Sequence, residues 1–89
     1  MAKWCVYVLR CVDNSLYTGA ATDIEARVSK HNAGKGAKYT RARLPVVLVY
    51  HETVENRGAA LRREAAIRRM PLPAKRRLIT LGCVDIGIK

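Results

Sequence analysis

The segment WCVYVLRCVDNSLYTGAA, residues 4–21, constrains the fold of this chain more than any other stretch. Its first eight residues, WCVYVLRC, are apolar at both alternating positions, which is typical of a β-strand covered on both faces. The residues VDNS favour a turn, and LYTGAA has the composition of a second strand. The segment therefore predicts a β-hairpin.

The length of the hairpin loop decides where Tyr7 and Tyr17 point. A two-residue loop would place the two rings on opposite faces of the sheet. A three-residue loop that ends at Asn14, with Asn14 in the left-handed region, pairs Cys11 with Ser15 and places both rings on one face as diagonal neighbours. Because asparagine tolerates the left-handed region better than most residues, we predict the three-residue loop.

Helix signals follow the hairpin. Thr22 and Glu25 form a capping-box pattern, which predicts a helix from Thr22 as N-cap to about Asn32. The glycines of AGKG then interrupt the helix, and KYTRAR is expected to be a basic loop.

The second half of the chain predicts one more strand and two more helices. LPVVLVYHET is rich in β-branched residues and predicts a strand whose start suits Pro45. Asn56 can cap a helix that runs to about Met70, where Pro71 ends it. PAKRRLITL predicts a last helix that Gly82 closes.

The resulting order, ββαβαα, indicates an α+β fold with a small three-stranded, mainly antiparallel sheet flanked by helices. The 89 residues are expected to form a single domain, 1–89. No apolar run approaches the ~20 residues of a membrane span, and MAKWCVYVLR lacks the pattern of a signal peptide. Cys5 and Cys11 would lie too far apart along one strand for a disulfide. We therefore expect a reduced, cytoplasmic protein with no membrane partner. The sequence leaves the oligomeric state open, and we favour a monomer.

Positive charge is the strongest global signal. Seventeen Lys and Arg face seven Asp and Glu, a net charge of +10. Residues 27–43 hold six basic residues and no acid, and residues 57–77 hold eight basic residues and one acid. Such clustering is typical of a protein that binds a polyanion, most often nucleic acid. The alternative is a solvated basic surface that only aids solubility.

Glu64 is the one acid in the second basic cluster. Its helical position is at the edge of the predicted buried face, where a carboxylate needs a partner. One interpretation is an ion pair with Arg68 one turn later. The other is a ligand for a hard divalent cation such as Mg²⁺. The sequence leaves both open.

Arg27 and His31 are four residues apart, so they project from one face of the first predicted helix. A guanidinium beside an imidazole suits a phosphate under attack, because the first takes charge and the second moves a proton. The alternative is a solvated helix face. Tyr7 and Tyr17 have a comparable alternative as core residues.

Taken together, these features resemble the GIY-YIG nuclease superfamily, and most closely its small stand-alone bacterial members. The resemblance runs from about Trp4 to Met70 and rests on CVY, on LYTG followed by TDIEARVSKHNAGKGAKYTR, and on ALRREAAIRR. Cys5 and Thr18 replace the usual first-motif glycine and second-motif aliphatic residue. The chain also carries no asparagine after Glu64, where some members use one.

The resemblance implies a metal-dependent DNA endonuclease that hydrolyses phosphodiester bonds in DNA repair or processing. Its catalytic residues would be Tyr7, Tyr17, Arg27, His31 and Glu64. Tyr7 would activate the attacking water, directly or through His31, with positive charge favouring its phenolate. Glu64 would hold one Mg²⁺ or Mn²⁺. The competing class is a nucleic-acid-binding module, for DNA or RNA, that does not cleave.

The basic loop would supply phosphate clamps and one aromatic residue for stacking an unpaired base. The alternative is a mobile loop whose charges contact nothing. With contacts to phosphates rather than base edges, we expect single-stranded or branched DNA to be preferred over a duplex sequence. The expected nucleic-acid-binding residues are Lys30, Lys35, Lys38, Tyr39, Thr40, Arg41 and Arg43.

Overall fold

The computed structural model describes the backbone of residues 3–87 and the side chains of residues 3–81. Its elements, in chain order, are β1 (Trp4–Arg10), β2 (Leu16–Ala21), α1 (Ile24–Asn32), α2 (Lys38–Arg41), β3 (Val47–Val54), α3 (Arg57–Arg69) and α4 (Leu72–Gly87). The three strands form one antiparallel sheet in the order β2-β1-β3. The α+β class and the three-stranded antiparallel sheet are confirmed.

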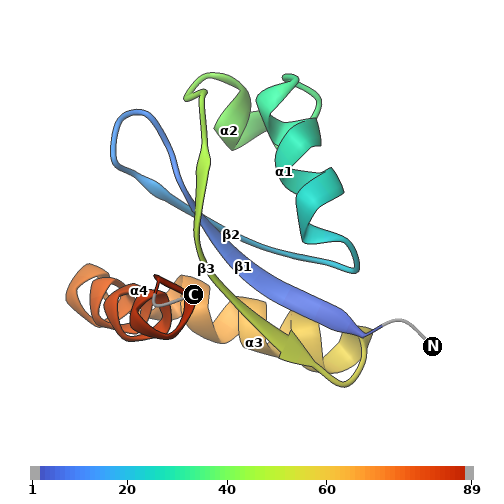
Figure 1. Ribbon diagram of the computed structural model, residues 1–89, viewed down its shortest axis with the longest axis vertical. Coiled ribbons are helices and arrows are strands. Elements are labelled where there is room, and N and C mark those ends of the chain that lie inside the picture. The colour runs from blue at the N-terminus through green and yellow to red at the C-terminus, as the bar shows by residue number, and fades with distance from the viewer. Residues whose placement is uncertain (1–2, 88–89) are drawn as a thin grey trace.

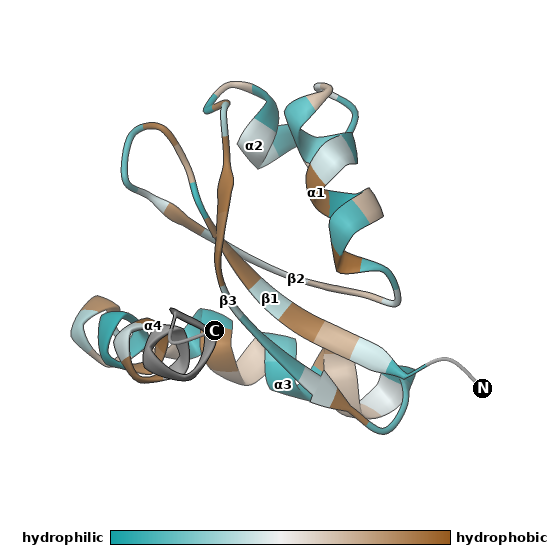
Figure 2. Ribbon diagram, viewed as in Figure 1, coloured by the Kyte–Doolittle hydropathy of each residue, from teal (hydrophilic) through white to brown (hydrophobic). Residues whose placement is uncertain are grey.

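Helices lie on both faces of the sheet (Figure 1). Helices α1 and α2 lie on one side, and α3 and α4 lie on the other. The strands carry much of the apolar sequence between the more polar helices (Figure 2). None of the helices in the described part of the chain is long and apolar enough to cross a membrane.

The central strand β1 contributes to a core on each face, as its doubly apolar pattern predicts. Val6 and Val8 pack with Tyr50 and with Ile67 of α3 in one cluster. Tyr7 and Leu9, on the alternate face, form a second cluster with Cys11 and Val46, against which Ile24 and Val28 of α1 pack. Burial of apolar side chains thus packs helices against each face of the sheet.

The hairpin has the predicted three-residue loop. The Cys11 amide donates to the Ser15 carbonyl at 2.8 Å, and Asn14 has a φ of +69°. Tyr7 is therefore opposite Gly19 across the β1–β2 ladder. Tyr7 and Tyr17 share the face that α1 covers, so this register prediction is confirmed.

Other predictions of local structure are corrected. Asp23, not Thr22, caps α1, because its carboxylate accepts from the Ala26 amide at 3.1 Å. The segment KYTRAR is not simply a loop, since its first four residues form α2. Strand β3 begins at Val47, after Pro45.

The helices of the second half are partly as predicted. Asn56 caps α3 by accepting from the Ala59 amide at 2.8 Å, which confirms that prediction. The last helix begins at Leu72 and continues through Gly82 to Gly87, so Gly82 does not close it. A glycine inside a helix weakens it by only about 1 kcal/mol, and is therefore no certain stop.

Candidate active site

Tyr7 lies at the centre of the β1–β2 ladder with its side chain 1% exposed. Gly19 is directly opposite it on β2. A Cβ atom added at Gly19 would lie 2.5 Å from the Tyr7 hydroxyl oxygen and 2.6 Å from Cζ. The tyrosine ring therefore occupies the space that any other residue at position 19 would fill.

His31, in the last turn of α1, is fully buried and faces Tyr7. Its Nε2 atom lies 3.2 Å from the Tyr7 hydroxyl oxygen. Its ring centroid lies 5.3 Å from that of Tyr17. The end of α1 is held in place by Asn32, whose amide accepts from the Val46 N–H at 2.8 Å and donates to the Val46 carbonyl at 3.1 Å. This pair of hydrogen bonds fixes where His31 meets the sheet.

The other ring nitrogen of His31 contacts Thr40. The Thr40 hydroxyl, on α2, lies 2.8 Å from His31 Nδ1, and its side chain is fully buried. The structure therefore places Thr40 in the interior beside His31, away from the surface where a nucleic acid would be contacted.

Arg27 lies one turn before His31 on α1. Its Nε atom is buried and has no hydrogen-bond partner among the residues that the structure describes. Interaction with Tyr7 raises the pKa of Arg27, so the guanidinium stays charged. A charged, buried donor without a partner is costly to a protein unless an anion completes it.

Burial reinforces the neutral forms of both Tyr7 and His31. Burial raises the pKa of Tyr7 above its ordinary value, and the opposing effect of Arg27 does not cancel it. Burial, followed by the charge of Arg27, lowers the pKa of His31. Both groups are therefore neutral at pH 7. Arg27 lowers the pKa of Tyr7, the direction that favours a phenolate, but the opposing effect of burial is larger.

Glu64 lies on α3 with its side chain 18% exposed, at the edge of the buried face as predicted. Its Oε2 atom forms an ion pair with Arg68 at 3.0 Å. Arg68 also donates to the Thr18 carbonyl at 3.1 Å and lies 5.8 Å from the Tyr17 ring centroid. Interaction with Glu64 contributes to the raised pKa of Tyr7, so the carboxylate lies within electrostatic reach of the tyrosine.

The ion pair with Arg68 does not exclude the other interpretation of Glu64, a ligand for a divalent cation. The 3.0 Å contact with Arg68 involves the Oε2 atom of the carboxylate. The described residues contain no cluster of three or more His, Cys, Asp or Glu that could hold a metal. A cation at this site would therefore have Glu64 as its single acidic ligand and water for most of the others, as Mg²⁺ accepts.

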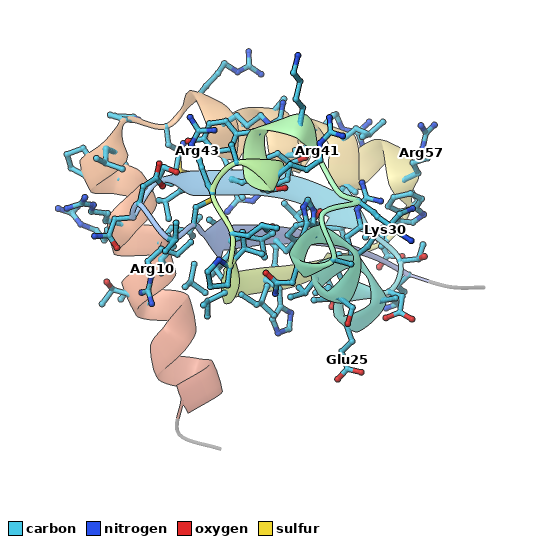
Figure 3. The ribbon with its side chains drawn as sticks, turned by 90° about the horizontal axis from the view of Figure 1, so that it is seen from above. Arg10, Glu25, Lys30, Arg41, Arg43 and Arg57 are labelled. Carbon is cyan, nitrogen blue, oxygen red and sulfur yellow. The ribbon has the colours of Figure 1, made fainter. Side chains whose placement is uncertain are left out.

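The basic residues expected to bind nucleic acid differ in their surroundings. Figure 3 shows Lys30, Arg41 and Arg43 along α1 and the segment that contains α2. Arg43 is engaged by its own chain, since it pairs with Asp13 at 3.1 Å and lies 4.0 Å above the Tyr39 ring. Lys30 and Arg41 are exposed, as are Lys35 and Lys38.

Tyr39 lies beside the tyrosine pair. Its ring stacks on that of Tyr17 at a centroid distance of 6.2 Å and an interplanar angle of 22°. Tyr17 thus contacts the rings of both His31 and Tyr39. This aromatic row extends from the buried hydroxyl of Tyr7 to the surface, where Tyr39 is 40% exposed.

Two surface clefts adjoin these residues. One, of about 350 Å³, has Tyr17, Tyr39, Arg68 and Lys75 in its lining. The other, of about 460 Å³, has Arg27 and Lys30 in its lining. Each cleft therefore combines cations with one of the predicted catalytic residues.

Sequence reasoning missed two contributors to this arrangement. The sequence predicts Arg68 only as an ion-pair partner of Glu64, whereas Arg68 also reaches the β2 backbone and the Tyr17 ring. Thr40 is predicted among the nucleic-acid-binding residues, whereas its side chain is fully buried. The contact between Thr40 and His31 joins two helices across nine residues, and no helical periodicity in the sequence signals it.

The GIY-YIG catalytic domain family matches residues 3–76 of this chain. Among curated relatives, a UPF0213 protein of Staphylococcus haemolyticus is 53% identical over 79 residues, which cover 89% of this chain and 96% of that protein. A UPF0213 protein of Streptococcus sanguinis is 56% identical over 73 residues, covering 82% of this chain and 84% of that protein.

Two solution NMR structures are also similar. The UPF0213 protein BH0048 from Bacillus halodurans has a TM-score of 0.58 and 40% identity, with 89% of this chain and 84% of that chain covered. The protein EF2693 from E. faecalis has a TM-score of 0.60 and 37% identity, with 91% and 88% covered. The chain therefore belongs to the GIY-YIG family, as a small member similar to the UPF0213 proteins. A GIY-YIG domain implies nuclease-type function with DNA as substrate, and nucleases of this family generally use divalent metals.

Proposed function

We propose that this chain is a metal-dependent endonuclease that hydrolyses phosphodiester bonds in single-stranded or structured DNA. The observation that carries the proposal is the hydrogen-bonded pair of Tyr7 and His31, which is buried beside the charged Arg27. A phenol and an imidazole held in this way suit the removal of a proton from water. A pure binding surface needs no such buried pair.

Tyr7 is the group that meets the attacking water. Because Tyr7 is neutral, it accepts a proton from water only as it passes its own proton on. His31 Nε2, at 3.2 Å, is the nearest group for that proton. General base catalysis of this kind contributes about 10²–10⁴-fold in rate.

Arg27 binds the scissile phosphate. Its buried Nε lacks a partner among the described residues, and a non-bridging phosphate oxygen would supply one. Charge-assisted hydrogen bonds from a guanidinium to phosphate are stronger than neutral ones, and they stabilise charge that develops during attack.

Glu64 would hold Mg²⁺ or Mn²⁺ through the carboxylate oxygen that Arg68 does not occupy. When bound, such an ion stabilises charge on the scissile phosphate and the leaving oxygen. Arg68 meanwhile keeps the carboxylate oriented toward β2, because it is itself anchored to the Thr18 carbonyl.

The DNA strand would lie along the two clefts that adjoin Tyr17 and Arg27. The exposed cations of α1 and α2 would neutralise its phosphates, and Tyr39 would stack an unpaired base. Since these contacts are to phosphates and base faces, they favour strandedness or shape over sequence. The proposed place of action is DNA repair or processing in the cytoplasm.

The test is a nicking assay on labelled single-stranded, duplex, flap and junction DNA, with Mg²⁺, with Mn²⁺ and with a chelator. Glu64→Gln should abolish cleavage while folding and DNA binding are retained. Glu52→Gln is the matched control, because Glu52 is also partly buried and pairs with Arg63 at 2.7 Å, but lies on β3. Cleavage by Glu64→Gln at the wild-type rate would show that Glu64 is only an ion-pair partner.

The competing function, a binding module that does not cleave, has its own outcome in this assay. A wild-type chain that binds DNA yet fails to nick any substrate with either metal would support the binding module. Wild-type cleavage that the chelator stops would support the endonuclease.

A further inference from the structure

Thr40 makes two contacts in the interior, and its hydroxyl has only one proton to give. Its Oγ1 atom lies 2.9 Å from the Ala37 carbonyl oxygen and 2.8 Å from His31 Nδ1. A carbonyl oxygen can only accept a hydrogen bond, whereas a ring nitrogen of histidine can donate or accept. The Thr40 proton therefore lies on the Ala37 side, since two oxygens at this distance repel unless a proton lies between them.

This arrangement assigns the proton on the His31 ring. With its own proton directed to Ala37, Thr40 Oγ1 presents a lone pair to His31, so Nδ1 carries the hydrogen of that contact. In neutral imidazole the other nitrogen is then a bare acceptor. That nitrogen, Nε2, is the one that faces the Tyr7 hydroxyl, so Tyr7 is the donor in their hydrogen bond.

The surroundings of His31 keep this arrangement closed to water. Both His31 and Thr40 are fully buried. The backbone at Gly36 comes so close to the ring that an added Cβ would lie 2.2 Å from Nδ1. The Nδ1 side of the ring therefore has Thr40 as its polar partner, with little space for another group.

We propose that Thr40 is a positioning residue that holds His31 in the Nδ1–H tautomer and so makes Nε2 the acceptor of the Tyr7 proton. The tautomer follows from the contacts of Thr40 alone, whereas its catalytic consequence rests on the endonuclease proposed above. The opposite tautomer would place a hydrogen between Nε2 and Tyr7, and Tyr7 would then have nowhere to send its proton.

Each proton that is released in the proposed reaction has an acceptor. As water attacks, one of its O–H bonds breaks and that proton moves to the Tyr7 oxygen, while the Tyr7 proton moves to His31 Nε2. The remaining hydroxide oxygen bonds to phosphorus, and the bond between phosphorus and the leaving oxygen breaks with its electron pair. The leaving oxygen takes a proton from solvent, and the imidazolium returns its proton to the Tyr7 oxygen as Tyr7 releases one to solvent. The phosphate charge beside His31 favours the transient imidazolium.

The first test reads the tautomer directly and needs no activity. Correlation spectra of ¹⁵N-labelled protein at pH 7 distinguish a protonated from a bare imidazole nitrogen. We expect His31 to have a protonated Nδ1 and a bare Nε2 in the wild type and in Thr40→Ser, which keeps the hydroxyl. Thr40→Val, which keeps the shape but loses the hydroxyl, should shift the ring toward Nε2–H. A wild-type ring with a protonated Nε2 would overturn the proposal.

The second test is kinetic. Thr40→Val should lower kcat by roughly 10- to 100-fold with KM within about twofold, because an acid–base contribution is lost and DNA contacts are not. Thr40→Ser should recover most of that loss. Thr80→Val is the matched control, since Thr80 also bonds a helix carbonyl, that of Arg76 at 3.0 Å, but on α4.

The outcomes of these tests distinguish a failure of the Thr40 proposal from a failure of the endonuclease proposal. If Thr40→Val keeps the Nδ1–H tautomer and a wild-type kcat, Thr40 does not position His31. If Thr40→Val does not fold, the wild-type and Thr40→Ser spectra decide the tautomer by themselves. If the wild type cleaves no DNA while its spectra show Nδ1–H, the tautomer assignment stands and the endonuclease proposal fails.

Discussion

Gly19→Ala is the smallest substitution that should displace the Tyr7 hydroxyl. The added Cβ would lie 2.5 Å from the Tyr7 oxygen, 2.6 Å from Cζ and 3.2 Å from Cε2 of Tyr17. The far end of an exposed side chain would swing away from such a contact. Tyr7 is only 1% exposed, so its ring has packed neighbours rather than solvent to move into.

The size of the displacement follows from these distances. Ordinary van der Waals contact begins near 3.4 Å, so the ring atom at 2.6 Å must retreat by about 0.8 Å. Overpacking of this kind costs roughly 1–3 kcal/mol of folding free energy. The hydroxyl at 3.2 Å from His31 Nε2 would move with the ring and lose its alignment. A misplacement of about 1 Å at a reacting group can cost about 10²-fold in rate.

The assay pairs urea unfolding with the nicking rate under single-turnover conditions. We expect Gly19→Ala to lower the unfolding free energy by about 1–3 kcal/mol and the rate by about 10²-fold. Gly58→Ala is the control, because a Cβ at Gly58, in the first turn of α3, would have its nearest neighbour at 3.4 Å and should stabilise the helix slightly. A Gly19→Ala variant with wild-type stability and rate would refute the placement of the Tyr7 ring.

Three further outcomes are expected. Replacing Lys38 and Arg41 together should flatten the salt dependence of single-strand binding by roughly one to two log–log units, and raise KM more than it lowers kcat; an unaltered slope would exclude this clamp. Tyr39→Ala should cost about 1–3 kcal/mol of single-strand affinity with little change in that slope, as a titration at two salt concentrations would show. Burial lowers the pKa of His31, so the unfolded chain binds its proton first and stability should fall as pH drops below about 6.5. Urea unfolding should show a smaller loss over this range in His31→Gln, and an equal loss would contradict the shift.

The hairpin could be predicted because its determinants are local. The apolar pattern of β1 defines a strand covered on both faces, and the preference of Asn14 for the left-handed region selects the loop. Once the loop length is set, strand geometry alone brings Tyr7 opposite Gly19 and places Tyr17 on the same face. The face shared by the two phenols therefore follows from a few residues near the turn.

The contacts around His31 could not be predicted, because they depend on how separate elements pack. Asp23, rather than Thr22, caps α1. Both residue types are good caps, and sequence alone does not rank such neighbours. The short helix α2 has no apolar periodicity of its own. Its position, and with it the contact of Thr40 with His31, is set by tertiary packing against α1.

For Glu64, the sequence predicted the position of the side chain but left its partner open. Helical periodicity placed the carboxylate at the edge of the buried face, and the i, i+4 spacing allowed for Arg68. The sequence presented the ion pair and the metal ligand as alternatives. The structure shows the ion pair, with Arg68 also tied to the β2 backbone, and the metal-ligand role of Glu64 is part of the proposed function.

For Tyr7 and Tyr17, a role in core packing does not exclude a role in chemistry. Tyr7 fills the core beneath α1 and at the same time hydrogen-bonds His31. Its pKa, ordinarily about 10 and raised further by burial, keeps it neutral at pH 7, so it can act on water only if a second group takes its proton. Tyr17, partly exposed and stacked on Tyr39, lies in the lining of a basic cleft. The two strands of one hairpin thus place one phenol in the core and the other at a surface cleft.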